Sequence, residues 1–96
     1  MEEQALQFVT YYEKQREIAD RFIALRKSRK ISQQRMSVIS GVSYATIRRF
    51  EQTGDISFAS FVQLALALQR YDDLDNLFVI KKEYKSIEEV IHDQKD

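Results

Sequence analysis

Two adjacent arginines, Arg48 and Arg49, lie in the segment GVSYATIRRFEQTG, which spans residues 41–54. A guanidinium group can donate two parallel hydrogen bonds to O6 and N7 of guanine, which contributes roughly 1–3 kcal/mol of discrimination between bases. The spacing of Ile47 and Phe50 predicts a helix that buries these two side chains. The residues then left on or near its opposite face are Tyr44, Thr46, Arg48 and Arg49. Such a face has the chemistry to contact a DNA groove.

A short helix is expected immediately before this one, over residues 32–40 with Ser32 as its N-cap. Gly41 ends it, because glycine adopts the left-handed conformation of a helix exit without the steric cost of a Cβ atom. Ser43 then caps the next helix. Two helices joined by a tight glycine-containing turn predict a helix-turn-helix at residues 32–52, whose second helix would lie in the major groove.

Three further helices are expected to surround this motif. The first begins at Thr10, where T-Y-Y-E has the spacing of a capping box, and ends near residues 28–30. Ser57 caps the fourth helix in chain order, and Asp72 or Asp73 caps a brief fifth. The residues expected to face the core are Ile18, Ala19, Phe22, Leu25, Met36, Ser37, Ser40, Val42, Ile47, Phe50, Phe58, Phe61, Val62, Ala65, Leu66 and Leu68. The fifth helix is expected to contain Leu74 and Leu77. The predicted fold is all-α with five helices.

The 96 residues contain no proline and two glycines, which indicates one domain built largely of helices. We expect an N-terminal extension at residues 1–9, the helix-turn-helix domain at residues 10–78 and a C-terminal tail at residues 79–96. The tail begins with the strand-like VIKKEY and continues with a capping-box pattern at residues 86–89, which predicts a short strand and a final helix. The strand could pair with its copy in a second subunit and so bury an exposed edge.

The net charge of zero conceals an uneven distribution along the chain. Residues 1–13 carry a charge of −3, residues 14–50 carry +8, and residues 51–96 carry −5. A phosphate backbone responds to such a local basic patch within a Debye length of about 8 Å. The pattern is compatible with DNA binding and equally with an ordinary solvated helix face.

Several classes of function are disfavoured by what the sequence lacks. It contains no cysteine and a single histidine, His92, so neither a metal site nor a Ser/His/Asp set is expected. No phosphate-binding glycine loop occurs either, and we expect a protein that is not an enzyme and takes no cofactor. The start of the chain is acidic and its longest apolar run is well below the roughly 20 residues of a membrane span, which predicts a cytoplasmic location.

The segment from Gln33 to Glu51, QQRMSVISGVSYATIRRFE, resembles the helix-turn-helix of the XRE family of Cro and phage-repressor type. The opening glutamine, the turn G-V-S, the T-I pair and the closing glutamate stand at the family's spacing. The following F-E-x-T-G-x-I-S and the LALAL helix resemble a branch found beside HipA-type kinases, the HipB-like antitoxins. The resemblance covers roughly residues 16–78.

This resemblance implies a role for each polar residue of the motif. Gln33 would contact a phosphate at the start of the first motif helix. The implied base-reading residues are Tyr44, Ala45 and Arg49. The other implied phosphate contacts are Ser43, Thr46, Arg48 and Gln52. The implied protein is a homodimer that binds an inverted-repeat operator, with recognition helices about one DNA turn (roughly 34 Å) apart, and represses its own operon. The alternative is an antitoxin that acts mainly by binding a HipA-like kinase toxin.

Three polar residues within the motif are expected to have structural roles. Ser37 and Ser40 occupy positions where the family prefers alanine. Each hydroxyl can bond to a carbonyl one turn back, so we expect reduced stability and an unchanged fold. Glu51 is expected to pair with a nearby arginine of the first helix, because an acid has little reason to face phosphates.

Val38 is the apolar residue of the motif that points away from the predicted core. Either the N-terminal segment at residues 7–9 covers it, or it meets a protein partner.

Overall fold

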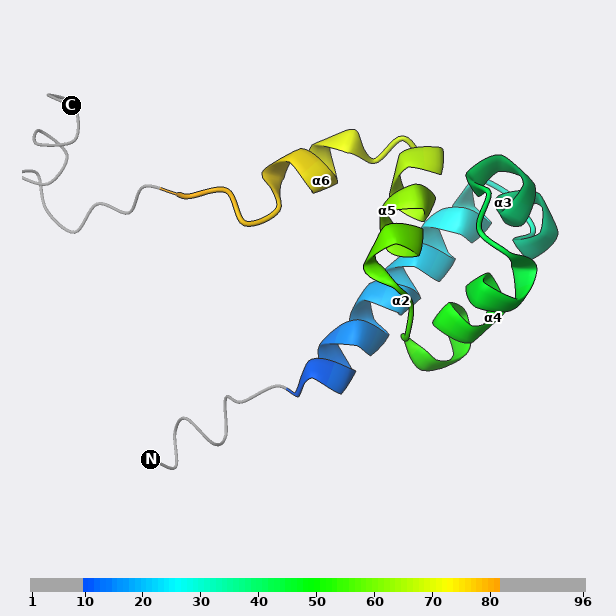
Figure 1. Ribbon diagram of the computed structural model, residues 1–96, viewed down its shortest axis with the longest axis horizontal. Helices are drawn as coiled ribbons and strands as arrows, with labels where there is room; N and C mark the ends of the chain where they lie inside the picture. Colours follow the sequence, from blue (N-terminus) through cyan, green and yellow to red (C-terminus); the bar gives the residue numbers. More distant parts are fainter. Residues whose placement is uncertain (1–9, 82–96) are drawn as a thin grey trace, which may run out of the picture.

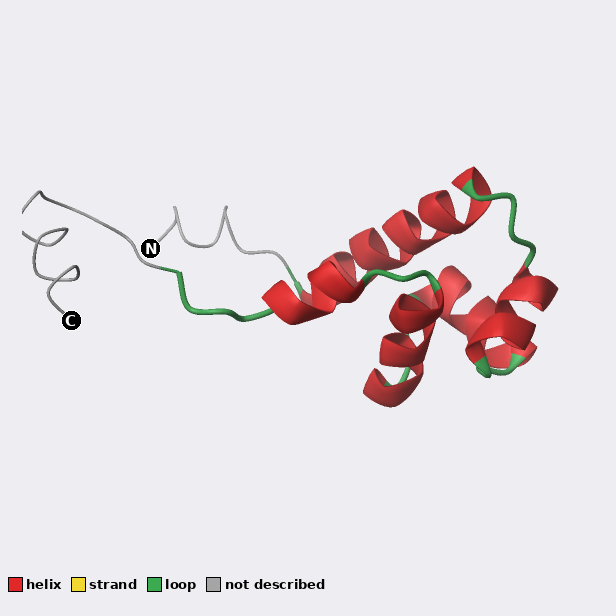
Figure 2. Ribbon diagram, turned by 90° about the horizontal axis from the view of Figure 1, so that it is seen from above, coloured by secondary structure: helices red, strands yellow, loops and turns green. Residues whose placement is uncertain are grey.

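The computed structural model describes residues 10–81 of the chain, and this part consists of helices and loops without a strand (Figures 1 and 2). Its helices, in chain order, are α2 (Tyr11–Ser28), α3 (Gln33–Ser40), α4 (Tyr44–Thr53), α5 (Phe58–Ala67) and α6 (Tyr71–Asn76). Within residues 10–81, the predicted all-α arrangement of five helices is therefore confirmed. No helix within residues 10–81 combines the length and the apolarity that crossing a membrane requires.

Four helices begin at the predicted N-caps: Thr10, Ser32, Ser43 and Ser57. In each case the side-chain oxygen accepts a hydrogen bond of 3.0–3.2 Å from the amide three residues later. Thr10 forms the complete capping box, since its own amide donates to the Glu13 carboxylate. These bonds satisfy amides that have no partner inside the helix, and so they fix where each helix starts.

The start of α6 differs from the prediction. The helix begins at Tyr71 with Arg70 as its N-cap, and neither Asp72 nor Asp73 caps it. Both aspartates lie in the first turn instead, where their negative charges interact favourably with the unpaired amides at the start of the helix. Asp73 accepts a 2.9 Å hydrogen bond from Nε of Arg70, and this bond, with the charge of Asp73, raises the pKa of Arg70.

The core lies where α2, α3, α4 and α5 meet. Its buried apolar residues are Ala19, Met36, Val42, Ile47, Phe50, Leu64 and Leu68. The Phe50 ring is at its centre, 5.4 Å from the Phe22 ring and 6.1 Å from the Phe61 ring, between centroids. The prediction for α5 was partly wrong, because Phe58 is 72% exposed and Leu66 is 44% exposed, whereas Leu64 is buried.

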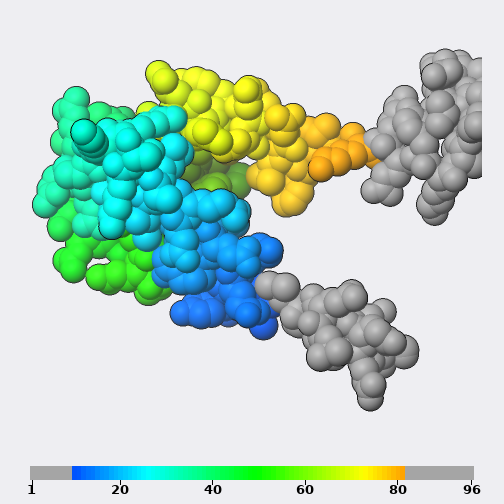
Figure 3. All heavy atoms as spheres, turned by 180° about the vertical axis from the view of Figure 1, so that it is seen from behind, coloured from blue at the N-terminus to red at the C-terminus, as the bar shows by residue number. Residues whose placement is uncertain are grey.

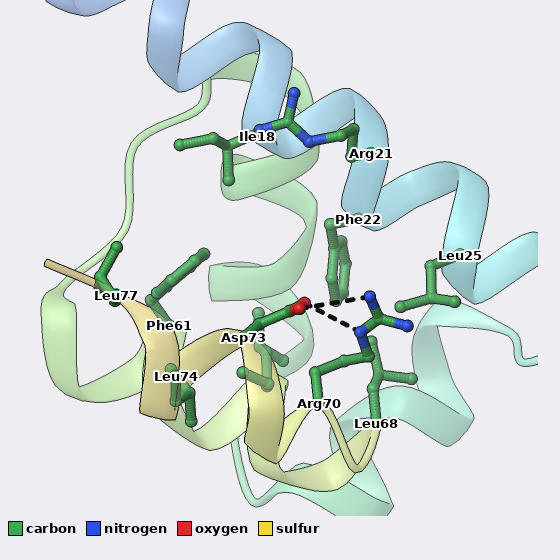
Figure 4. Close-up of a pocket in the computed structure, with 12 residues that line it drawn as sticks. Ile18, Arg21, Phe22, Leu25, Phe61, Leu68, Arg70, Asp73, Leu74 and Leu77 are labelled. Carbon is green, nitrogen blue, oxygen red and sulfur yellow. Dashed lines mark hydrogen bonds and ion pairs between the residues drawn. The ribbon is translucent and has the colours of Figure 1, made fainter. Parts of the chain in front are cut away.

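A groove of about 530 Å³ runs between α2, α5 and α6 (Figure 3). Phe22, Phe61 and Leu74 contribute to its apolar walls, and the ion pair between Arg70 and Asp73 lies along it (Figure 4). The chain then leaves the body of the protein. Leu77, Phe78, Val79 and Ile80 are 48%, 93%, 52% and 92% exposed.

The predicted C-terminal strand is not present in the described residues that it includes, because Val79, Ile80 and Lys81 have no strand conformation. The remainder of VIKKEY, the predicted final helix and the N-terminal extension at residues 1–9 lie outside the described residues.

Candidate nucleic-acid interface

Helices α3 and α4 lie together at the end of the molecule opposite α6 (Figure 1). The turn between them has the geometry that the sequence predicts. Gly41 has a φ of +77°, in the left-handed region, and its amide donates to the carbonyl of Ser37 at 2.9 Å. Val42 is buried directly after it. Gly41 thus turns the chain between the two helices, and the buried Val42 side chain attaches the turn to the core.

The predicted hydrogen bonds from the two serines of α3 to carbonyls one turn back do not form. Both hydroxyls bond to Val42 instead. The Ser37 hydroxyl donates forward to the Val42 carbonyl at 2.6 Å, and the Ser40 hydroxyl accepts from the Val42 amide at 3.0 Å. Both backbone polar groups of Val42 are therefore satisfied by serine side chains across the turn. Alanine at either position would provide no such bond, so these serines link the end of α3 to the start of α4.

Glu51 fixes the inner side of α4. Its carboxylate accepts from Nε and Nη2 of Arg26 in α2, at 2.7 and 2.8 Å, which confirms the predicted pairing with an arginine of the first helix. It also accepts from Nε2 of Gln33 at 2.8 Å. One carboxylate thereby joins α2, α3 and α4.

The outer side of α4 carries the predicted base-reading residues. Tyr44, Ala45 and Arg49 are all exposed, because the buried residues of this helix are Ile47, Phe50 and Glu51, which lie on its other side. Arg48 is exposed beside them, with its guanidinium carbon 5.7 Å from the centroid of the Tyr44 ring. This distance is short enough for a cation–π interaction.

The residues predicted to contact phosphates differ in how exposed their side chains are. Arg48 and Gln52 are exposed, whereas Thr46 and Gln33 are half-buried. The Ser43 hydroxyl donates to Oγ1 of Thr46 at 2.8 Å and also caps α4. The side-chain amide of Gln33 donates to Glu51. Gln33 is the first residue of α3, so its position at the helix N-terminus still suits a phosphate contact.

Two exposed charged residues of α3 and of the turn after α4 were not identified from the sequence. Arg35 in α3 is exposed, and Asp55, just beyond α4, accepts a 2.8 Å hydrogen bond from Nη2 of Arg49. Neither residue gives a strong signal in the sequence, because exposed charged side chains are common in short helices and in the turns that follow them.

Part of the basic charge of residues 14–50 is used inside the protein. Arg26 is buried against Glu51, Arg16 donates to the carbonyls of Glu51 and Gln52, and Arg29 donates to the carbonyl of Leu68. In residues 10–81, Arg35 and Arg48 form no ion pair. The cations available to a phosphate backbone therefore include one on each helix of the motif.

Comparisons of this chain with models of known protein families, with curated proteins and with solved structures found no match. The family resemblance of residues 33–51 accordingly stays a prediction that depends on the residues themselves.

Proposed function

We propose that the protein is a sequence-specific DNA-binding transcriptional regulator, with α4 as its recognition helix. The observation that carries the proposal is the division of α4 into two sides. Ile47, Phe50 and Glu51 are buried and anchored to the other helices, whereas the outer side exposes an aromatic residue, an alanine and two arginines. A helix held this rigidly on one side and this polar on the other is suited to insertion into a major groove.

In this proposal the residues divide into two groups. Arg49, Tyr44 and Ala45 would read base edges, with Arg49 donating to guanine and Ala45 packing against a thymine methyl group. The phosphate contacts would come from Gln33, Ser43, Thr46, Arg48 and Gln52. Contacts to phosphate position the protein, while contacts to bases provide its sequence preference. Release of counterions by the cations would make the affinity strongly dependent on salt.

The proposed form is a homodimer on an inverted-repeat operator, acting as a repressor of its own operon. Support for self-association comes from the apolar segment Leu77–Ile80, in which Phe78 and Ile80 are almost fully exposed. Exposed apolar residues in succession are typical of a surface that a partner covers.

The proposal is tested by fluorescence anisotropy with DNA from upstream of the protein's own gene and with scrambled DNA, over a series of salt concentrations. We expect tighter, salt-sensitive binding to the upstream DNA, and a loss of that preference in Arg49→Ala. Arg70→Ala is the matched control, because it removes the same charge from the N-cap of α6, a helix at the other end of the molecule from α4 (Figure 1). Weak and equal binding to both DNAs would contradict repression of its own operon.

A second candidate function is that of an antitoxin that binds a HipA-like kinase toxin. The observation that favours it is the apolar outer surface of α3, where Val38 is 72% exposed and Ile39 is 39% exposed. Co-purification with the product of an adjacent kinase-like gene tests it. We expect Val38→Asp to weaken that complex while leaving the fold intact, and an unchanged complex would exclude this surface.

A further inference from the structure

Arg49, the proposed guanine reader, already has an acidic partner. Its Nη2 lies 2.8 Å from Oδ2 of Asp55, and the two side chains are 71% and 57% exposed. Asp55 is beyond the end of α4, six residues along the chain, so the pair is not one of the i,i+4 pairs that helix geometry produces by itself. Something else must bring the carboxylate back to the outer side of α4.

The turn after α4 places Asp55 there. Gly54 has a φ of +82°, which reverses the chain immediately after Thr53. The Thr53 hydroxyl donates to the carbonyl of Arg49 at 2.7 Å and accepts from the amide of Asp55 at 3.1 Å. One hydroxyl thus links the backbone of Arg49 to the backbone of Asp55, which brings Asp55 within reach of the Arg49 side chain.

The contact leaves most of the guanidinium group available. A guanidinium has five N–H groups, and the hydrogen bond to Asp55 uses one of them. The remaining donors still include a pair that can approach O6 and N7 of a guanine. An arginine that is held by a carboxylate samples fewer rotamers, so it loses less conformational entropy when it binds.

We propose that Asp55 is a positioning residue that determines specificity, by orienting the Arg49 guanidinium toward guanine and by opposing phosphates with its own charge. This inference rests on the proposed function. It makes two predictions of opposite sign. Without Asp55, discrimination in favour of guanine should fall, because Arg49 is free to contact phosphates. Affinity for unrelated DNA should rise, because a negative charge has been removed from the interface.

A purely electrostatic role for Asp55 makes a different prediction. Removing one surface charge would then tighten binding to every duplex by the same factor and leave the preference among duplexes unchanged. The ratio of affinities, rather than either affinity alone, therefore separates positioning from simple repulsion.

The experiment begins with duplexes selected by the unmodified protein from a randomised pool. Affinities of the unmodified protein, Asp55→Ala and Asp55→Asn are then measured for the selected duplex, for the same duplex carrying 7-deazaguanine at each guanine in turn, and for a scrambled duplex. Because 7-deazaguanine lacks N7, it reports on the proposed bond directly. Asp73→Asn is the control, since it removes an exposed acid of α6 that pairs with Arg70. Thermal melting of each variant checks that it is folded.

In Asp55→Ala we expect the preference for the selected over the scrambled duplex to fall by about fivefold or more, the lower limit of what one arginine–guanine pair contributes. Sensitivity to 7-deazaguanine should disappear at one position. Asp55→Asn keeps an acceptor oxygen, so it should retain part of the preference while binding the scrambled duplex more tightly. An unchanged ratio in Asp55→Ala overturns the inference and leaves the proposed function intact. If the unmodified protein enriches no sequence, the proposed function fails and the inference fails with it.

Discussion

The Arg26 guanidinium and the Glu51 carboxylate form two hydrogen bonds, of 2.7 and 2.8 Å, in the interior of the protein. The two side chains are 8% and 7% exposed. Gln33 donates a further bond to the carboxylate, and Arg26 donates from Nη1 to the carbonyl of Ile31. In residues 10–81, every buried side-chain nitrogen and oxygen has a partner. The ion pair therefore connects α4 to α2 through a fully satisfied polar network.

Breaking this pair from one side should destabilise the fold strongly. We expect Arg26→Met or Glu51→Gln to lower the free energy of unfolding by about 3–5 kcal/mol, because a buried charge or polar group loses its partner. The measurement is urea denaturation followed by circular dichroism. The double variant Arg26→Met with Glu51→Leu should recover much of the loss, since it leaves no unpaired charge behind.

The control for this pair is Glu17→Gln, which breaks the exposed ion pair with Lys14. Exposed pairs contribute about 0–1 kcal/mol, so this variant should unfold almost as the unmodified protein does. Single variants of Arg26 or Glu51 that cost no more than Glu17→Gln would show that the buried pair does not hold α4 in place.

The two glycines should differ in their tolerance of a side chain. Both have a left-handed φ, so alanine at either position should cost about 1–2 kcal/mol from backbone strain. A Cβ atom at Gly41 meets nothing within 4 Å, whereas a Cβ atom at Gly54 lies 3.1 Å from the backbone carbonyl carbon of Gln15. Thermal melting should therefore give a lower midpoint for Gly54→Ala than for Gly41→Ala. Equal midpoints would mean that α2 shifts away without cost.

The hydrogen bond from Ser37 to Val42 should make alanine unfavourable at position 37. Without the Ser37 hydroxyl, the Val42 carbonyl loses this hydrogen-bond donor. We therefore expect Ser37→Ala to lower the free energy of unfolding by about 0.5–1.5 kcal/mol. This is the reverse of what the helix propensities of the two residues predict. Ser28→Ala, at the exposed end of α2, is a control with an exposed hydroxyl bond. Stabilisation by Ser37→Ala would support the sequence-based expectation that serine weakens this helix.

The features that the sequence predicted well are those that depend on a few neighbouring residues. Thr10, Ser32, Ser43 and Ser57 were recognisable as N-caps because a cap bonds to an amide only three residues away. The exposed outer side of α4 was predictable because Ile47 and Phe50 define a clear helical stripe. The predicted residue roles on DNA stay predictions.

The features that the sequence did not predict depend on tertiary contacts. The apolar run of α5 is too continuous for its periodicity to identify Leu64, rather than Phe58, as the buried residue. The serines of α3 form hydrogen bonds across the turn, to the carbonyl and the amide of Val42, and not along the helix. Asp55 approaches Arg49 only because Gly54 and Thr53 reverse the chain, which residue spacing alone does not reveal.

The apolar segment after α6 should control self-association. Phe78 and Ile80 are 93% and 92% exposed, so replacing both by serine should leave the fold unchanged and remove apolar surface that a second subunit would cover. By sedimentation equilibrium we expect the unmodified protein to be a dimer and the double variant a monomer. The variant should also bind a duplex with two inverted half-sites no more tightly than a duplex with one. Phe58→Ser is the control, because Phe58 is 72% exposed on α5 and should not affect the dimer. A monomeric unmodified protein, or a double variant that remains dimeric, would exclude this segment as the dimer contact.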